Sequence, residues 1–381
     1  MRALVTGGAG FIGSHIVDEL LRKGYEVRVL DNLERRVHPK GKPNYIPEEV
    51  EFIEGDVADK EAVRKALKGV DVVFHQAAYQ DYMPDFSKFF RTNVVGTAMI
   101  YEVIVEDRLE VEKIIVASSQ AVYGEGQYEC PEHGFTMPPA RSREQLDRGE
   151  WELRCPLCGR IMKNLPLKEE HVNPYNQYAL SKYSGEMTAL RLGYRLGIPT
   201  VALRYSITQG PRQSLYNQYS GVCRIFTLRL LNDKPPIIFE DGLQQRDYVH
   251  VDDVVRANMM ALEDKRANYE AFNVGGGRAT TVIEYAKLLA RKLGKAIEPV
   301  IPGEYRFGDN RHSVSSIEKI KSVLGWEPRK GLEEIFEDYI AWVREQGDLR
   351  AFFEEADRLM RQMQVIRKSR VKSRGSRDKR L

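Results

Sequence analysis

The chain has 381 residues, of which 30% are charged and 42% hydrophobic, a composition typical of globular rather than disordered or fibrous proteins. Its net charge of +3 is uneven: residues 361–381 carry nine Lys or Arg and one acid, which leaves −5 for the rest, so we expect no nucleic-acid partner for the globular part. No apolar run approaches the ~20 residues that cross a bilayer and no secretory signal follows Met1, so we expect a cytoplasmic protein without a membrane partner.

Short apolar strands alternate with amphipathic stretches over the first 120 residues. Strands are predicted at residues 3–5, 26–30, 51–53, 70–74 and 113–117, with helices between them, for example at 12–23 and 62–67. This alternation predicts an α/β fold with a parallel, doubly wound sheet of the Rossmann type.

The rest of the chain is less regular. Residues 125–171 are polar, rich in Pro and Arg, and are predicted to form an insertion. A helix at 176–194 and a strand at 200–203 resume the first pattern, and we assign residues 1–124, 172–205 and 247–272 to the nucleotide-binding domain. Residues 206–246 and 273–345 are predicted to form a smaller α/β substrate lobe that ends in a helix at 332–345. An amphipathic helix is predicted over 346–366, and disorder over the basic residues 367–381.

A glycine-rich loop follows the first predicted strand and opens the first helix. Gly7, Gly10 and Gly13 allow a tight turn, and the helix start supplies free N–H groups for a pyrophosphate. Asp31 ends the second strand, 18 residues after Gly13, where a carboxylate binds a ribose 2′-hydroxyl and repels a 2′-phosphate. The pattern therefore predicts NAD as the cofactor; the alternative is a plain glycine-rich turn before a helix.

Two short knuckles hold three of the four cysteines. Cys130 and His133 form the first, Cys155 and Cys158 the second, and each is followed directly by Gly. Three thiolates and one imidazole are a tetrahedral set that zinc prefers, and four protein ligands indicate a structural metal. The alternative is a loop of reduced cysteines without metal. Cys223 lies in an apolar helical pattern and is expected to be core.

Tyr178 and Lys182 are spaced i and i+4 on the predicted helix, so both face the same way. A nearby ammonium favours the phenolate, which could take a proton from a substrate hydroxyl while hydride leaves the same carbon. Ser119 follows the fifth strand, at the sheet edge where ligands bind, and could hydrogen-bond that hydroxyl. A surface pair of Tyr and Lys is the alternative for the bare motif.

These motifs occur with others in an order that resembles the extended short-chain dehydrogenase/reductase family, in its NAD-dependent nucleotide-sugar epimerase/dehydratase branch. The resemblance covers about residues 1–345, interrupted by the insertion. The segments that carry it are Thr6 to Gly13, Asp31-Asn32, Gly55-Asp56-Val57, His75 to Ala78, Asn93 to Thr97, Ser118 to Gly124, Tyr178 to Lys182 and Arg246 to Val254.

The resemblance implies roles for individual residues. The catalytic residues would be Ser119, Tyr178 and Lys182. The cofactor contacts would be Gly7, Gly10, Phe11, Ile12, Gly13, Asp31, Asn32, Asp56, Val57, Ala77, Ala78, Asn93, Tyr178, Lys182 and Tyr205. The substrate contacts would be Tyr79, Gln80, Ser119, Gln120, Ile207, Arg246 and Arg311. Both arginines match residues that grip the nucleotide diphosphate, with a surface ion pair as the alternative for each.

Members of this branch share an oxidation at sugar C4 and differ in the fate of the 4-keto sugar. Dehydratases carry Asp-Glu, and decarboxylases a Glu, where this chain has Gln120-Ala121. Because neither residue is an acid or base, the resemblance implies a 4-epimerase, similar to those acting on dTDP-L-rhamnose and UDP-hexoses. An NAD-dependent dehydrogenase or reductase, and a non-catalytic NAD-binding scaffold or sensor, are the alternatives. Ile207 stands where the family usually has Asn, so the nucleotide and the sugar stay open.

Two features of assembly are also expected. Relatives usually dimerise through the helix that bears the tyrosine and its neighbour, so the resemblance implies a homodimer. The insertion leaves the chain between Gly124 and Tyr178, and we expect it to overhang the mouth of the site as a lid or a subunit contact.

Overall fold

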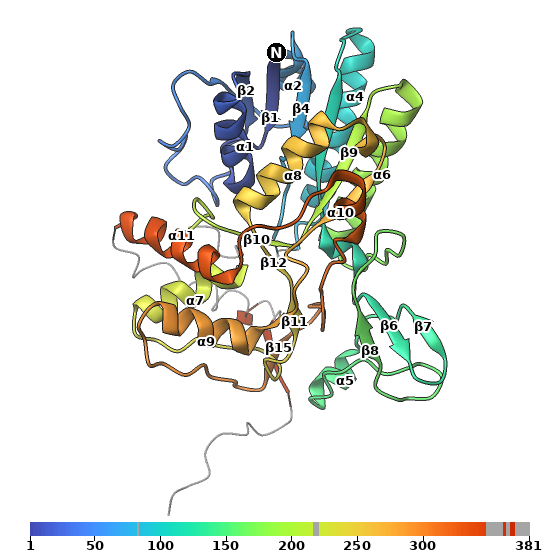
Figure 1. The fold of residues 1–381 in the computed structure, drawn as a ribbon, viewed down its shortest axis with the longest axis vertical. Coiled ribbons are helices and arrows are strands. Elements are labelled where there is room, and N and C mark those ends of the chain that lie inside the picture. The colour runs from blue at the N-terminus through green and yellow to red at the C-terminus, as the bar shows by residue number, and fades with distance from the viewer. Residues whose placement is uncertain (82–83, 216–220, 348–360, 363–365, 370–381) are drawn as a thin grey trace, which may run out of the picture.

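The first and largest unit of the fold is a seven-stranded parallel sheet. The computed structural model describes residues 1–81, 84–215, 221–347, 361–362 and 366–369. The strand order is β13 (Ala271–Val274), β9 (Thr200–Tyr205), β5 (Lys113–Ser119), β4 (Val72–His75), β1 (Arg2–Thr6), β2 (Glu26–Asp31) and β3 (Glu51–Glu54). The chain order reverses between β1 and β4, so the prediction of a Rossmann-type, doubly wound sheet is confirmed (Figure 1).

Helices cover both faces of this sheet. On one face α1 (Phe11–Arg22) packs beside α8 (Val251–Glu263), and their apolar sides join one core cluster with the strands. On the other face lie α2 (Lys60–Leu67), α4 (Gly96–Glu106) and α6 (Gln177–Leu196), whose buried side chains form a second cluster. A short helix α3 (Phe86–Phe90) and a π-helical turn η1 (Arg91–Val95) lead into α4. The strands are buried on both faces, which is why they read as continuous apolar runs.

A second lobe faces the carboxyl ends of the strands. Its core is built by α7 (Gly221–Leu231), α9 (Val282–Lys292) and α11 (Leu332–Glu345). Two short ladders connect it to the sheet, β10 (Ile207–Gln209) with β12 (Tyr248–His250) and β11 (Gln245–Arg246) with β14 (Thr280–Thr281). The helix α10 (Glu318–Leu324) returns to the first unit, where it contacts β13.

The insertion is a small unit with little core of its own. It contains β6 (Gln127–Cys130), β7 (Gly134–Thr136), α5 (Arg143–Asp147) and β8 (Lys163–Leu165), and extends away from the sheet (Figure 1, green). It follows the 3₁₀ turn η2 (Gln120–Tyr123), which continues from β5. Its two ends meet, because the Asn173 N–H donates to the Val122 carbonyl over 3.0 Å. Gly124 has φ +60°, and a Cβ there would lie 2.2 Å from the Asn173 carbonyl oxygen.

The C-terminal region differs at residues 367–369 from the prediction of disorder over 367–381, while residues 370–381 lie outside the described residues. Residues 366–368 form β16 (Ile366–Lys368), which pairs antiparallel with β15 (Glu304–Arg306) of the second lobe. Arg361 adds an ion pair to Glu304 at 2.7 Å. The prediction failed at these residues because the segment lacks periodicity and its partner strand lies about 60 residues earlier. Most of the helix predicted over 346–366 lies outside the described residues.

Within the described residues, no helix is both long and apolar enough to cross a membrane. The cytoplasmic location stays a prediction.

Candidate active site

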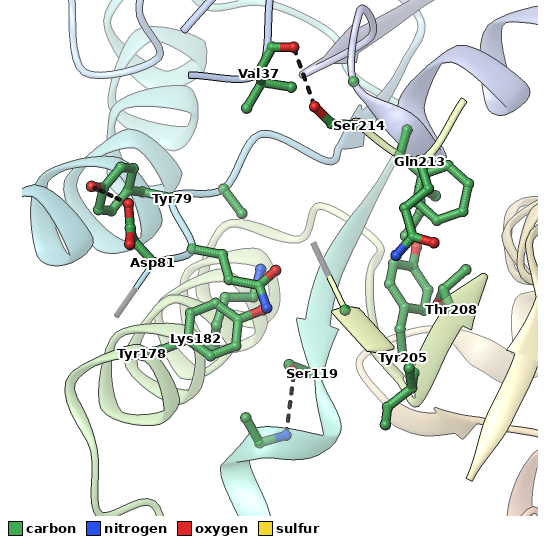
Figure 2. Close-up of a pocket in the computed structure, with 18 of the residues that line it drawn as sticks. Val37, Tyr79, Asp81, Ser119, Tyr178, Lys182, Tyr205, Thr208, Gln213 and Ser214 are labelled. Atoms are coloured by element: carbon green, nitrogen blue, oxygen red, sulfur yellow. Dashed lines mark hydrogen bonds between the residues drawn. The ribbon is translucent and has the colours of Figure 1, made fainter. Parts of the chain in front are cut away.

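A cavity of about 870 Å³ lies between the carboxyl edge of the parallel sheet and the second lobe. One half is lined by the glycine-rich loop and by the residues that follow β2, β3 and β4. The other half is lined by α7, by the strand-poor segments around 237–239 and 306–310, and by β10 to β12. Ser119, Tyr178 and Lys182 lie where the two halves meet (Figure 2). Such crevices at the switch point are where open α/β sheets bind ligands.

The glycine-rich half presents backbone donors. Gly10 is the N-cap of α1 and gives no side-chain cap, so the first amides of the helix face the cavity without a side-chain acceptor. Gly7 has φ +68°, and its N–H donates to the Leu30 carbonyl at 2.8 Å, which fixes the loop against β2. A Cβ at Gly13 would lie 2.2 Å from the Gly7 carbonyl oxygen, so the close helix–strand packing requires glycine.

Asp31 supplies the anionic end of this half. Its carboxylate accepts from the Ala9 N–H at 3.0 Å and from the Leu33 N–H at 2.9 Å. Burial raises the pKa of Asp31, against the lowering effect of these two hydrogen bonds and of His38. Free amides at a helix start suit a pyrophosphate, and a carboxylate at the end of the next strand suits a ribose hydroxyl, which are both parts of a dinucleotide. The residues present therefore fit NAD.

Most of the predicted cofactor residues line the cavity. Those that do are Gly7, Gly10, Phe11, Ile12, Gly13, Asp31, Asn32, Val57, Ala77, Ala78, Tyr178, Lys182 and Tyr205. Asp56 does not line it and accepts from the Asn32 side chain at 2.9 Å. Asn93 is buried beneath the wall of the cavity. Its side-chain amide accepts from the Tyr79 N–H, donates to the Tyr79 carbonyl and donates to Ser181 Oγ at 2.9 Å. In this structure the two residues support the wall of the cavity.

The side chains of Tyr178 and Lys182 project from the same side of α6, and Ser119 ends β5 opposite them (Figure 2). Burial raises the pKa of Tyr178, while a hydrogen bond with the Ser119 hydroxyl lowers it. Burial lowers the pKa of Lys182 to about 8, and the charge of Glu186 opposes this. The Lys182 ammonium donates to the Ala117 carbonyl. The tyrosine thus has a hydrogen-bonding partner and a titratable amine nearby, but its own burial disfavours the phenolate.

The predicted substrate residues divide into two groups. Tyr79, Gln80, Ser119, Gln120, Ile207 and Arg246 line the cavity. The Arg246 guanidinium is anchored by the Asn310 carbonyl at 2.8 Å and the Arg311 carbonyl at 3.0 Å. Tyr79 donates its hydroxyl to Asp85 at 2.5 Å.

Arg311 does not line the cavity in this structure, so the structure does not bring it to the predicted diphosphate site, and its substrate contact stays a prediction. Its side chain is completely buried and is held by Glu152, Glu240 and Asp241. Three carboxylates hold the guanidinium away from the cavity, and one of them, Glu152, belongs to the insertion. Nor is Arg311 the surface ion pair of the alternative interpretation.

Several cavity residues were not found from the sequence. Arg224 and Arg229 come from α7, and Arg306 lies over the Phe239 ring at 5.0 Å from its centroid. Arg367 reaches the cavity from β16. These arginines belong to no recognisable sequence motif. The only signal in the sequence that could have indicated them is the excess of Arg over Lys in these segments.

The four predicted metal ligands converge. The Cys130 Sγ lies 3.6 Å from both the Cys158 Sγ and the His133 Nδ1, and the Cys155 Sγ lies 3.5 Å from the same nitrogen. All four ligand atoms lie within 4.8 Å of one another. Backbone amides of Cys158 and Leu157 point at Cys155 Sγ and lower its pKa against the effect of burial. The arrangement can hold a tetrahedral ion.

The insertion does not overhang the cavity, contrary to expectation. None of the described residues from 125 to 171 lines it. The unit packs instead on the outer side of the second lobe, for example through Tyr305, whose hydroxyl donates to Asp147 at 2.5 Å. Its ends leave and rejoin the fold on the same side, and this directs it away from the cavity mouth.

His250, Asp252 and Asp338 also lie close together. The Lys330 ammonium contacts both carboxylates, at 2.7 and 2.8 Å. A cation already occupies the place a metal would take, so this cluster is an ion-pair network between α8 and α11.

Comparison with known proteins agrees with this site. The profile described as the NAD dependent epimerase/dehydratase family matches residues 3–144 and 158–275. The dTDP-L-rhamnose 4-epimerase of Burkholderia thailandensis is 32% identical over 356 residues, which cover 91% of this chain and 96% of that protein. The crystal structure of UDP-glucose 4-epimerase from Thermotoga maritima with UDP-glucose is 34% identical, with a TM-score of 0.74, covering 91% of this chain and 100% of the other.

The structure of a third relative contains both a nucleotide sugar and NAD. UDP-glucuronic acid 4-epimerase from Bacillus cereus, in complex with UDP-glucuronic acid and NAD, is 26% identical with a TM-score of 0.74, covering 91% of this chain and 99% of the other. The profile spans more than half of this chain and leaves out only residues 145–157 of the insertion within its range. The chain therefore belongs to the NAD-dependent epimerase/dehydratase family.

Proposed function

We propose that this protein is an NAD-dependent nucleotide-sugar 4-epimerase with Ser119, Tyr178 and Lys182 as its catalytic residues. The observation that carries the proposal is their position where the cofactor half and the substrate half of one cavity meet. The relatives with 4-epimerase activity in their names support the same reaction.

The chain's own residues suggest how the proton moves. Tyr178 Oη would take the proton of the sugar C4 hydroxyl, and Ser119 Oγ would hold that hydroxyl in place. Lys182, one helical turn away, favours the phenolate when it is protonated. Bound NAD would supply the hydride acceptor and donor for C4. The ketone formed in this way would be reduced on its opposite face, with Tyr178 returning the proton.

Positions 120 and 121 hold no acid, and this limits the reactions that the 4-keto sugar could undergo. Gln120 lines the cavity and accepts from the Ser313 hydroxyl at 3.0 Å, and Ala121 beside it carries no functional group. Neither can protonate a leaving hydroxyl or assist elimination across C5 and C6. Epimerisation needs only the oxidation and its reversal, so it is the reaction that these residues support.

The substrate that we propose is a nucleoside diphosphate sugar. The Arg246 guanidinium donates to three backbone carbonyls at the cavity wall, those of Gln245, Asn310 and Arg311, so its position is defined before a ligand binds. A planar guanidinium held in this way suits a diphosphate oxygen. The three relatives act on UDP- or dTDP-linked sugars according to their names, and both nucleotides are candidates here.

We also propose a structural zinc ion at Cys130, His133, Cys155 and Cys158. With Zn–S bonds of about 2.3 Å, tetrahedral geometry places two thiolates roughly 3.8 Å apart. The 3.6 Å between Cys130 and Cys158 is close to that value. The local core contains only Tyr128, Leu153 and Met162 besides the ligands, so the metal would hold the unit together.

A homodimer through α6 and its neighbours is the assembly we propose. Phe86, Phe90, Val95 and Leu180 are at least 39% exposed and lie on α3, η1 and α6, which contact one another. A shared apolar face of this kind suits a twofold contact. Light scattering of the purified protein would give the mass of the particle, and a monomer at micromolar concentration would refute the proposal.

The activity is tested by incubating the purified protein with UDP-glucose, UDP-glucuronic acid and dTDP-L-rhamnose and following C4 inversion by NMR. Inversion without added NAD and without net NADH formation is the expected result. Stoichiometric release of NADH would instead indicate a dehydrogenase, and NAD binding without turnover of any of the sugars would favour a non-catalytic role.

A further inference from the structure

Arg141 of the insertion is buried in the interface with the second lobe, with only 2% of its side chain exposed. Its guanidinium donates to Glu125 at 3.0 Å and to Glu240 at 2.9 Å. The same group also donates to the Asp309 carbonyl oxygen at 2.7 Å. One insertion side chain therefore contacts the start of the insertion, the second lobe and the backbone after β15.

Arg311 completes this contact from the other side. Its side chain binds Glu240 and Asp241 of the second lobe and Glu152 of the insertion, at 2.9, 2.7 and 2.5 Å. Its backbone N–H donates to Glu125 at 2.7 Å. Glu125 and Glu240 thus each contact both arginines. We refer to Glu125, Arg141, Glu152, Glu240, Asp241 and Arg311 as the buried ionic cluster.

The backbone held by this cluster lines the cavity. Residues 306–310 and 313 are lining residues, and residues 307–312 lie in neither helix nor strand. Tyr175, just before α6, holds the same stretch from another direction. Its hydroxyl lies 2.8 Å from the Gly308 carbonyl oxygen and 2.5 Å from the Asn310 Oδ1. Without regular structure, the course of the 306–313 segment depends on contacts with groups outside it.

We infer that Arg141 and Tyr175 are positioning residues for the nucleotide-sugar half of the site, acting through the 306–313 segment. The inference rests on the proposed function for its link to substrate. Arg141 fixes the Asp309 carbonyl and Tyr175 fixes Gly308 and Asn310, and the Asn310 and Arg311 carbonyls in turn anchor the Arg246 guanidinium. The insertion therefore acts on the substrate from behind the cavity wall.

The cofactor half of the cavity takes no part in the contacts that link Arg141 and Tyr175 to Arg246. Gly7, Gly10 and Asp31 lie on the opposite side of the cavity and hydrogen-bond within the β1–α1 and β2 loops. Loosening the 306–313 segment should therefore weaken nucleotide-sugar binding and leave NAD binding unchanged. A purely structural role would instead lower both together.

The test compares Arg141→Met and Tyr175→Phe with the wild type in the full-length protein. Amide hydrogen exchange of residues 303–313 is the first measurement, and it needs no substrate. The second is the pair of dissociation constants for UDP-glucose and for NAD, with KM and kcat where turnover is found. We expect faster exchange in this segment and a ~10-fold rise in the UDP-glucose Kd and KM for either variant, with NAD affinity and kcat changed little.

Arg148→Met is the matched control, because Arg148 lies in the same insertion, is 58% exposed and, among the acids that the structure describes, pairs with Glu150 alone. It should change neither exchange nor affinity. Arg141→Met leaves buried carboxylates short of one partner, which destabilises the unit. If this variant unfolds, Tyr175→Phe, which removes only one hydroxyl, carries the test. Arg141→Lys keeps the charge and should restore part of the affinity.

Unchanged exchange at 303–313 in Tyr175→Phe would overturn the inference, and so would faster exchange without loss of UDP-glucose affinity. If the wild type bound neither UDP-glucose nor a dTDP-sugar, the proposed function would fail. The exchange measurement would still decide whether Arg141 and Tyr175 hold the segment.

Discussion

The Lys182 ammonium on α6 donates a hydrogen bond to the Ala117 carbonyl oxygen on β5. This bond joins the helix that carries Tyr178 to the strand that ends at Ser119. Lys182 is thus placed to fix the distance between the two elements as well as to act electrostatically.

Replacing Tyr178 by Phe removes the hydroxyl that we propose takes the C4 proton. We expect kcat to fall by about 10²–10⁴-fold, the usual contribution of a general acid or base, with NAD still bound. Tyr183→Phe is the control, since Tyr183 lies on the same helix and does not line the cavity. Single-turnover kinetics would check this, and a Tyr178→Phe enzyme with near wild-type kcat would refute the proton role.

Lys182 should make stability depend on pH in a defined window. Burial lowers its pKa from 10.5 to about 8, so the unfolded chain binds more protons between pH 8 and 10.5, and stability rises with pH there. Below pH 8 the cost of burying the charge is fully present, about 3 kcal/mol. The melting temperature of Lys182→Met minus that of the wild type should therefore be largest below pH 8 and shrink toward pH 10.5.

This comparison is made on nucleotide-free protein by calorimetry. Lys182→Met also loses the hydrogen bond to the Ala117 carbonyl. This loss shifts the difference in melting temperature by a similar amount at each pH below 8. A difference that stays constant from pH 7 to pH 10 would show that Lys182 does not titrate in this range.

Two glycines of the cofactor loop should respond differently to alanine. In Gly13→Ala the new Cβ would lie 2.2 Å from the Gly7 carbonyl oxygen, so the nucleotide-free protein should be destabilised. In Gly10→Ala the nearest atom is the same oxygen at 3.2 Å, so the fold should be retained while NAD binding weakens at the cavity wall. Melting temperature and NAD affinity, measured side by side, separate the two effects, and equal melting temperatures would contradict the packing argument.

Zinc analysis of the purified protein should give about one ion per chain. Cys155→Ser should lose the metal, and a strong chelator should lower the melting temperature of the wild type. Cys223→Ser is the control, because Cys223 is buried in α7, far from the knuckles in the fold. A well-folded wild type without zinc, or zinc retained fully in Cys155→Ser, would exclude the proposed site.

Periodicity in the sequence predicted six of the seven strands of the sheet and several of its helices, but neither β13 nor α8 was predicted. The helix predicted at 332–345 has those bounds in the structure, because its apolar positions face one core and its first turn carries Glu333 and Glu334. Most strands were predicted slightly short, since polar residues such as Asp31 and Ser119 end β2 and β5 where they enter the cavity. The strand predicted at 70–74 was instead placed two residues too early, because β4 begins at Val72. Local patterns thus located the elements and the sheet edge.

Pairing over long distances was not predictable in the same way. Arg311 looked like a diphosphate ligand, but Glu152 and Glu240 lie about 160 and 70 residues before it, and no local pattern shows that they meet it. The same holds for β16, whose partner β15 has no strand signal of its own. The Arg311–Glu152 ion pair is one of the long-range contacts that join the insertion to the second lobe, and the insertion does not line the cavity as expected.

The closure of the insertion at its base has a consequence for how this fold can change. Because the Asn173 N–H is bonded to the Val122 carbonyl, the two ends of the insertion lie side by side. The positions of β5 and α6, which precede and follow it, therefore do not depend on the length of the insertion. Ser119 and Tyr178 are separated by 59 positions in the chain, yet that number has little bearing on where they lie. Modules of different length could therefore stand between Gly124 and Asn173 without displacing Ser119 and Tyr178, provided that they supply partners for the buried side chains of Glu240 and Arg311.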